Sequence, residues 1–307
     1  MKTHNHSIDK CFLNFFNERM EYLRKCNRFG TYYNYRRART SLENFLDCRR
    51  LCFGDIDQAF IESYYDWLLL KGMTRNSVSF HLRIIRAVYN KGVRLGYCNQ
   101  KTPFLNVYTG IDKTRKRCVN DDILHKLRSL TLQCPSLELT RDLFLFSVYT
   151  RGMAFVDMAH LRPTDIQGEN IIYRRKKTGQ LLTIRIEKQI KEILKKYMKN
   201  RENKTYIFPI LSVSDPATEY TLYCRAISAY NYRLKKLSAM LDDGVCLTSY
   251  TARHTWASLA YKYNIPLAMI SAGMGHTSEK TTRIYLETID NRQLDEANRS
   301  FLKRLGV

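Results

Sequence analysis

Long apolar runs are missing from this sequence of 307 residues, in which no stretch of about 18 apolar residues occurs. A membrane-spanning helix needs roughly 20 of them, so no such helix is predicted. The opening residues, MKTHNHSIDK, also lack the apolar core of a signal peptide. With 44% hydrophobic residues, the chain is still apolar enough to fold around one large core or two moderate ones. We therefore expect a folded cytoplasmic protein.

Paired cysteines of the C-x-x-C type are also missing, although the chain has nine cysteines. Cys48 and Cys52 lie close in sequence, but no second pair of cysteines or histidines completes a zinc site. This pattern is typical of reduced thiols in a cytosolic protein. The sequence predicts neither a bound metal nor a cofactor.

Acidic residues are scarce: 29 aspartates and glutamates stand against 51 lysines and arginines, which gives a net charge of +22 and a pI near 9.7. This balance predicts a polyanionic partner, and nucleic acid is the first candidate. An anionic membrane surface is the rival. It is disfavoured because the basic residues are spread over every segment of the chain.

Residues 1–105 show the pattern of a helical domain. Apolar residues recur at helical spacing in four segments, which begin near Ser7, Tyr32, Asp57 and Thr74. Short loops between them predict a four-helix unit. Arginines interleaved with tyrosines suit contacts with DNA phosphates, although a solvated surface position explains any single one more simply. The candidates are Arg36, Arg37, Arg75, Arg83 and Arg86.

Residues 106–119, NVYTGIDKTRKRCV, have no apolar period and are predicted to form a basic linker. Its charges would lie against the phosphate backbone and position DNA without specifying its sequence. The candidates in this linker are Lys113, Arg115, Lys116 and Arg117.

Residues 120–307 are predicted to be mainly helical with a small β-hairpin. Strands at 171–177 and 181–186 flank a turn at Thr178–Gly179, and a short buried strand is predicted at 206–209. Helices are expected to begin at 120 and at 253, and to span 136–149, 187–200, 219–242 and 266–272. Gly273 is expected to end the last of these. A further short helix is expected after a cap at Ser278, and an amphipathic helix is expected in the tail at 291–307.

Arg253, His276 and Tyr285 form the most informative constellation, with separations of 23 and 9 residues. A phenol has a pKa near 10, so it attacks a phosphodiester only where cations and donors surround it. Arginine offers two donors to the charged phosphate oxygens, and histidine can donate to them or take the tyrosine proton. Each residue alone is a weak signal. Together they predict phosphodiester chemistry on Tyr285.

The segment MGHTSEKTTRIY at 274–285 resembles the closing motif L-G-H-x-x-x-x-T-T-x-x-Y of the tyrosine recombinase (phage integrase) family. The resemblance extends over nearly the whole chain. It implies a mainly α fold with a small β-sheet, in which an N-terminal helical core-binding (SAM-like) domain precedes a catalytic domain. It also implies a bacterial site-specific recombinase that acts as a homotetramer on double-stranded DNA, through a 3′-phosphotyrosyl intermediate and without a cofactor.

The sequence departs from this family at the first catalytic arginine. Residues 150–161, TRGMAFVDMAHL, align with the motif T-G-L-R-x-x-E-L-x-x-L, but Ala154 stands in place of its arginine. Arg151 lies about one helical turn earlier, if the helix has begun there. Arg175 is an equal candidate, because on a strand it would share the face of Lys177.

Three more residues complete the predicted site. The resemblance makes Lys177, with Lys176 as second choice, the acid that protonates the leaving 5′-oxygen. Tyr250 stands where the family has a histidine, three residues before Arg253. A phenol can donate to phosphate but is a poor base near neutral pH, so His254 is a candidate to share that role.

Two other functions remain compatible with these patterns. A recombinase relative that binds DNA without cutting it is favoured by the changes at Ala154 and Tyr250. A type IB-like topoisomerase would share the chemistry but would not pair two sites. Covalent trapping on nicked DNA separates the first alternative from a recombinase, and relaxation of DNA without a target sequence identifies the second.

Overall fold

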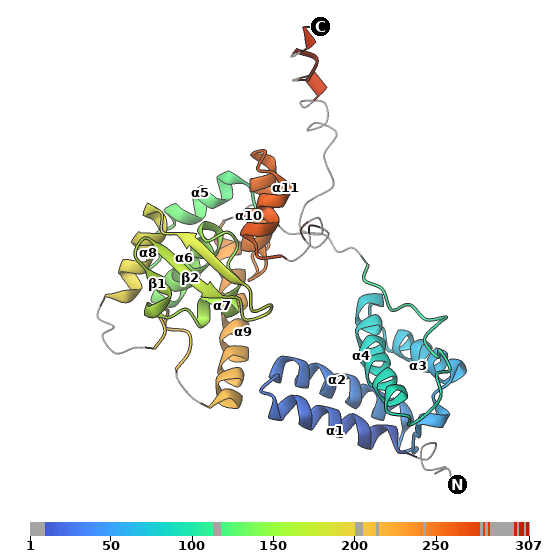
Figure 1. Ribbon diagram of the computed structural model, residues 1–307. Coiled ribbons are helices and arrows are strands. Elements are labelled where there is room, and N and C mark those ends of the chain that lie inside the picture. Colours follow the sequence, from blue (N-terminus) through green and yellow to red (C-terminus); the bar gives the residue numbers. More distant parts are fainter. Residues whose placement is uncertain are drawn as a thin grey trace. The chain divides into compact units, whose positions relative to one another are not determined.

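The computed structural model describes residues 10–112, 118–199, 205–212, 215–241 and 244–276, with positions 279, 282, 298–299, 301–303 and 305–306. The chain divides into two compact units, Met1–Thr114 and Arg115–Val307, each with its own core (Figure 1). The described part is mainly helical with one small antiparallel sheet, as the sequence predicts. None of its helices is long and apolar enough to cross a bilayer.

Four α-helices build the first unit. The helix predicted to begin near Asp57 starts at Gln58, and the carboxylate of Asp57 caps it by accepting a hydrogen bond from the backbone N of Phe60 at 2.9 Å. The apolar faces meet in a core rich in aromatic rings, where Phe12 packs edge-on against Phe53. The start predicted at Ser7 lies outside the described residues. The helices are α1 (Phe12–Lys25), α2 (Phe29–Leu46), α3 (Gln58–Leu70) and α4 (Arg75–Arg94).

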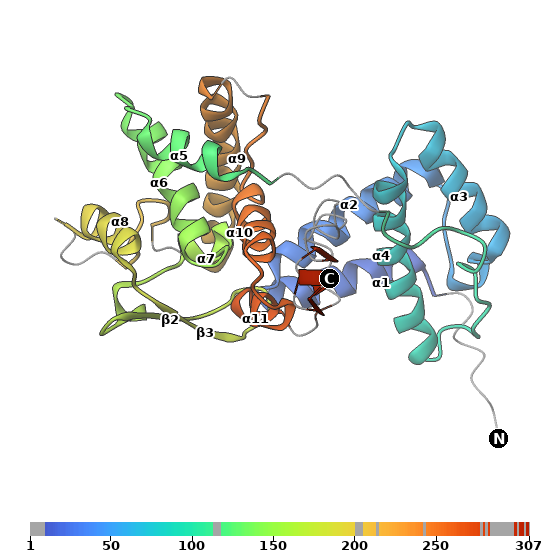
Figure 2. The same cartoon turned by 90° about the horizontal axis from the view of Figure 1, so that it is seen from above.

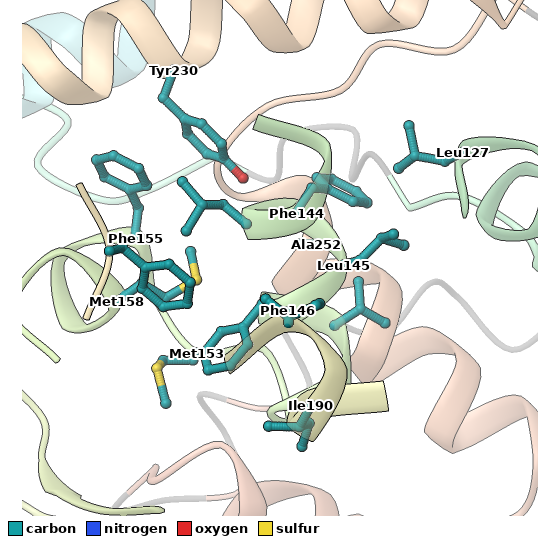
Figure 3. Packing of buried hydrophobic residues seen from close by; sticks show 14 of the residues in the cluster. Leu127, Phe144, Leu145, Phe146, Met153, Phe155, Met158, Ile190, Tyr230 and Ala252 are labelled. Atoms are coloured by element: carbon teal, nitrogen blue, oxygen red, sulfur yellow. The ribbon is translucent and has the colours of Figure 1, made fainter. Parts of the chain in front are cut away.

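The second unit packs its helices around α6 (Pro135–Tyr149), which is apolar on nearly all sides and therefore becomes the central helix. Phe144, Leu145 and Phe146 project from different sides of α6 in Figure 3, and Ile190 of α8 and Tyr230 of α9 belong to the same cluster. The other helices are α5 (Asp121–Ser129), α7 (Phe155–Ala159), α8 (Lys188–Met198), α9 (Pro216–Met240), α10 (Thr251–Lys262) and α11 (Leu267–Gly273).

The sheet has the order β1-β2-β3, with β1 at Ile166–Gln167, β2 at Asn170–Arg174 and β3 at Leu181–Arg185. Ile171 pairs with Ile184, and both side chains are buried in the core of the second unit. Gly179, with a φ of 71°, permits the turn that the sequence predicts. Figure 2 shows that the β2–β3 hairpin ends beside α11.

Two local predictions are wrong. Residues 206–208 are buried and Pro209 is exposed, but none of the four belongs to a strand; Ile207 donates one backbone hydrogen bond to Leu161, and no ladder follows. Gly273 is the last residue of α11, and the left-handed stop falls on Gly275, with a φ of 64°. The helix predicted after Ser278 and most of the tail predicted at 291–307 fall outside the described residues.

Candidate active site

Arg253 is the centre of the cluster and is only 5% exposed. It lies in the first turn of α10, and its guanidinium Nη1 and Nη2 donate to the carbonyls of Gly152 at 2.6 Å and Met274 at 2.7 Å. Gly152 has a φ of 73°, and a Cβ there would lie 2.9 Å from Arg253 Cγ. The turn after α6 therefore needs glycine at this position, both for its positive φ and to leave space for the Arg253 side chain.

His276 lies directly beside this guanidinium. Its Nε2 is 3.0 Å from Arg253 Nη2, and its Nδ1 is 2.8 Å from Thr282 Oγ1. Burial, followed by the positive charges of Arg253, Arg175 and Lys177, lowers the pKa of His276 to about 4. The imidazole is therefore neutral near pH 7.

Arg175 joins the same cluster from the hairpin. It is 7% exposed, and its Nη1 donates to the Gly275 carbonyl at 2.6 Å. The prediction that it shares a face with Lys177 is wrong, because β2 ends at Arg174 and Lys177 lies in the turn beyond it. Arg175 turns inward while Lys177 stays exposed. A Cβ on Gly275 would lie 2.9 Å from Arg175 Cδ, so the left-handed glycine also makes room for this side chain.

Arg151 borders the cluster. The helix that would place it one turn before position 154 has not begun, since α6 ends at Tyr149 and α7 starts at Phe155. Arg151 instead adopts a left-handed turn with a φ of 59°. Its Nη1 lies 3.4 Å from the Thr183 carbonyl of β3, and its Cδ lies against Gly273. It is half-buried, whereas Arg175 is buried.

Asp157 lies beside the cluster, in the segment that aligns with the family motif at 150–161. It is buried in α7, and its Oδ1 accepts the backbone N–H of Lys176 at 2.8 Å. Burial raises the pKa of this carboxyl, while the backbone hydrogen bond and the charges of Arg175 and Arg253 oppose the rise. Asp157 thus ties the hairpin turn to α7. No sequence signal reveals this contact, because its partner is a backbone group.

The remaining predicted residues stand at the edge of this cluster or outside the described chain. Lys177 is exposed in the hairpin turn, with its charge acting on His276. Tyr250 is 52% exposed just before α10, and its ring centroid lies 5.7 Å from that of His254. Tyr285 lies outside the described residues.

The basic candidates of the first unit lie on its surface. Arg36 and Arg37 are exposed and line a groove of about 830 Å³ together with Trp67. Arg75 stacks on the Tyr108 ring with its guanidinium carbon 3.8 Å from the centroid. Two other candidates, Arg83 and Arg86, are half-buried on α4, and Arg86 donates to Thr109 at 2.9 Å. Lys113, Arg115, Lys116 and Arg117 lie outside the described residues.

Together these contacts describe a buried cationic cluster of the kind that binds an anion. Burying a guanidinium is costly unless hydrogen bonds satisfy it, and backbone carbonyls accept hydrogen bonds from both Arg253 and Arg175. Two forked guanidiniums beside a neutral imidazole match the oxygens of a phosphodiester. In the described residues, no group of histidine, cysteine and carboxylate side chains is arranged to hold a metal ion.

Comparison with known proteins identifies the family of this chain. The chain matches the phage integrase SAM-like domain over residues 11–107 and the phage integrase family over residues 121–292. The second match covers more than half of the chain. The chain therefore belongs to the phage integrase family. This confirms the family that the motifs predict.

Individual relatives are distant. Tyrosine recombinase XerA of Saccharolobus solfataricus is 26% identical over 147 residues, which cover 48% of this chain but only 43% of that relative. A lambda integrase dimer bound to a COC′ core site has a TM-score of 0.64 at 17% identity, covering 92% of this chain and 78% of that one. The Tn1549 transposon integrase in complex with circular intermediate DNA also has a TM-score of 0.64, at 12% identity, covering 94% and 99%. At these identities the solved structures establish the shared fold.

Proposed function

We propose that this protein is a site-specific DNA recombinase that cuts and rejoins double-stranded DNA through a 3′-phosphotyrosyl intermediate on Tyr285. The observation that carries the proposal is the convergence of Arg253, Arg175 and His276 in one cluster, with His276 lying 9 residues before the tyrosine in the sequence. Membership of the phage integrase family supports the same chemistry.

In this mechanism, Arg253 and Arg175 hold the non-bridging oxygens of the scissile phosphate and stabilise the charge that develops as Tyr285 attacks. We choose Arg175 over Arg151 as the second arginine, because it is buried and bonded to the carbonyl next to His276. Lys177, exposed at the hairpin turn, protonates the leaving 5′-oxygen. The energy of the broken bond is kept in the phosphotyrosine, so rejoining needs no ATP.

The two units have separate tasks in this proposal. The helices of residues 1–105 and the basic linker at 106–119 bind the phosphate backbone of the recombination site, while residues 120–307 carry out the cleavage. We propose that four protomers assemble on two sites and exchange strands in pairs, in the bacterial cytoplasm. The choice among integration, excision and inversion then depends on how the sites are arranged.

A nicked suicide substrate tests the chemistry, because loss of a short fragment beyond the cut traps the covalent adduct. The DNA beside the gene is first sequenced to search for inverted repeats, and any repeats found there are built into the substrate. We expect wild type to form the adduct and Tyr285→Phe to form none. Tyr263→Phe is the matched control, since Tyr263 is an exposed tyrosine at the end of α10, and it retains the adduct.

Two other results would replace this proposal with the alternatives. Specific binding by wild type without any adduct would make the protein a DNA-binding relative that does not cut. An adduct accompanied by relaxation of supercoiled DNA that lacks the repeats would instead indicate a topoisomerase.

A further inference from the structure

The contacts of His276 determine which of its ring nitrogens carries the proton. The guanidinium of Arg253 has donors only, so the Nε2 that lies 3.0 Å from Nη2 must accept the hydrogen bond. The neutral imidazole then carries its hydrogen on Nδ1 and donates it to Thr282 Oγ1 at 2.8 Å. Thr282 is fully buried, which makes water a poor substitute for its hydroxyl.

Binding of a phosphate to Arg253 can make the Nε2 lone pair of His276 available. Arg253 Nη2 has two hydrogens, and they point to the Met274 carbonyl and to His276 Nε2. A phosphate oxygen that binds Nη2 must therefore displace one of these acceptors. If Nε2 is displaced, its lone pair is exposed next to the bound phosphate, while the Nδ1 hydrogen stays on Thr282.

We propose that Thr282 is a positioning residue that holds His276 in the Nδ1-protonated form, so that Nε2 takes the proton of the nucleophilic tyrosine. This inference rests on the proposed function. In the step, the hydroxyl proton of Tyr285 moves to His276 Nε2, and the phenolic oxygen forms a bond to phosphorus. The bond from phosphorus to O5′ breaks, and O5′ takes a proton from Lys177.

The surroundings of His276 set its protonation state before and after a phosphate binds. The cations that face it are Arg253 from α10 and Arg175 and Lys177 from the hairpin turn, and with burial they keep the free imidazole neutral. A bound phosphate brings negative charge to the same place and stabilises the imidazolium. Tyr250, which occupies the position of the family's other histidine, is a poor base near neutral pH.

The tautomer is tested on the DNA-free protein by NMR with ¹⁵N-labelled histidine. The chain has seven histidines, and the His276 signals are those that disappear in His276→Gln. We expect a protonated Nδ1 and an unprotonated Nε2 near neutral pH in wild type and in Thr282→Ser. In Thr282→Val the hydrogen is expected to redistribute between the two nitrogens. An unprotonated Nδ1 in wild type would overturn the proposal whatever the activity.

Adduct formation on the suicide substrate tests the catalytic half. A general base typically contributes about 10²–10⁴-fold, so Thr282→Val, which weakens but does not remove the base, is expected to slow adduct formation about 10- to 100-fold. Thr282→Ser keeps the hydroxyl and restores most of the rate. If Thr282→Val shifts the tautomer but forms the adduct at the wild-type rate, the proposal is wrong.

A protein that merely lost local packing would slow without a change of tautomer, and that outcome also contradicts a positioning role. Should Thr282→Val fail to fold, the wild-type and Thr282→Ser spectra still decide the tautomer. Absence of any adduct in wild type would refute the proposed function, and with it the proton transfer, while the spectrum would still report on the Thr282 contact.

Discussion

The two units of this chain treat their charged residues in opposite ways. Among the described residues of the first unit, the buried polar side chains are Ser41, Ser79 and His81, and no buried arginine or carboxylate occurs. Among its own described residues, the second unit buries four charged side chains, at Asp142, Asp157, Arg175 and Arg253. An exposed cation keeps its hydration, whereas a buried one loses it. In the proposed function, the exposed cations of the first unit attract DNA, and the buried arginines of the second unit bind one phosphate.

The strongest test of this contrast is Arg253→Ala. Removing one preorganised donor to a transition-state oxyanion costs roughly 10²–10³-fold in rate, and this change removes a fork of two, so we expect at least a 10³-fold slower adduct formation. Single-turnover trapping measures the rate, and DNA affinity should change far less. Arg174→Ala is the control, because Arg174 is exposed next to the cluster and donates only to its own hairpin at Gly179. Equal losses in both variants would contradict the distinction between buried and exposed arginines.

The next effect decides between the two candidates for the missing arginine. We expect Arg175→Ala to slow adduct formation roughly 100-fold, within the range for one lost donor, and Arg151→Ala to slow it less than about tenfold. The physical reason is that Arg175 is buried against Gly275, next to His276, whereas Arg151 is half-buried against β3. The same trapping assay compares them. The reverse order would assign the role to Arg151.

The sequence predicts the helices and the family well, because helical periodicity, caps and the closing motif are local patterns. The helix predicted from Asn120, for example, begins at Asp121 with Asn120 as its cap. The shared face of Arg175 and Lys177 was predicted wrongly because the strand was extended to Lys177, beyond the end of β2 at Arg174. The alternation of buried and exposed side chains continues to Arg175, but Lys177 lies in the exposed turn. The contacts of Asp157 with the Lys176 backbone and of Thr282 with His276 were not foreseen, because they depend on where three segments meet. The periodicity of one segment carries no information about that meeting.

Asp142, the buried carboxylate outside the candidate site, should affect stability and not chemistry. Burial alone would raise its pKa, but hydrogen bonds from Lys196, Tyr197 and Arg141 outweigh burial and lower it. A carboxyl whose pKa is lower in the folded state stabilises the fold above its unfolded value, near 4, and loses this effect as the pH falls through the folded value. We expect Asp142→Asn to destabilise the second unit by about 2 kcal/mol near pH 7, since Lys196 is partly solvated.

Hydrogen exchange of the α6 amides measures this loss locally. The difference between wild type and Asp142→Asn should shrink as the pH is lowered below about 4. Asp66→Asn is the control, because Asp66 is an exposed carboxylate on α3 of the first unit, and it should change little at any pH. A pH-independent difference at Asp142 would mean that the charge is not the stabilising feature.

The smallest effect is expected where the charges are solvated. Arg36→Gln with Arg37→Gln removes two exposed cations from the groove on the first unit. If both contact phosphates, affinity for DNA should fall about equally for target and unrelated sequences, because phosphate contacts do not read bases. The slope of log K against log salt should fall by roughly 0.9 for each lost contact.

Arg24→Gln is the control, because Arg24 lies on α1 and is paired with Glu21, and it should leave the slope unchanged. Since the two arginines are exposed and lie in the first unit, away from the buried cluster in sequence, the rate of adduct formation at saturating DNA should stay at the wild-type value. A lower rate at saturation would mean that this surface also shapes the chemistry, and the division of tasks between the two units would fail.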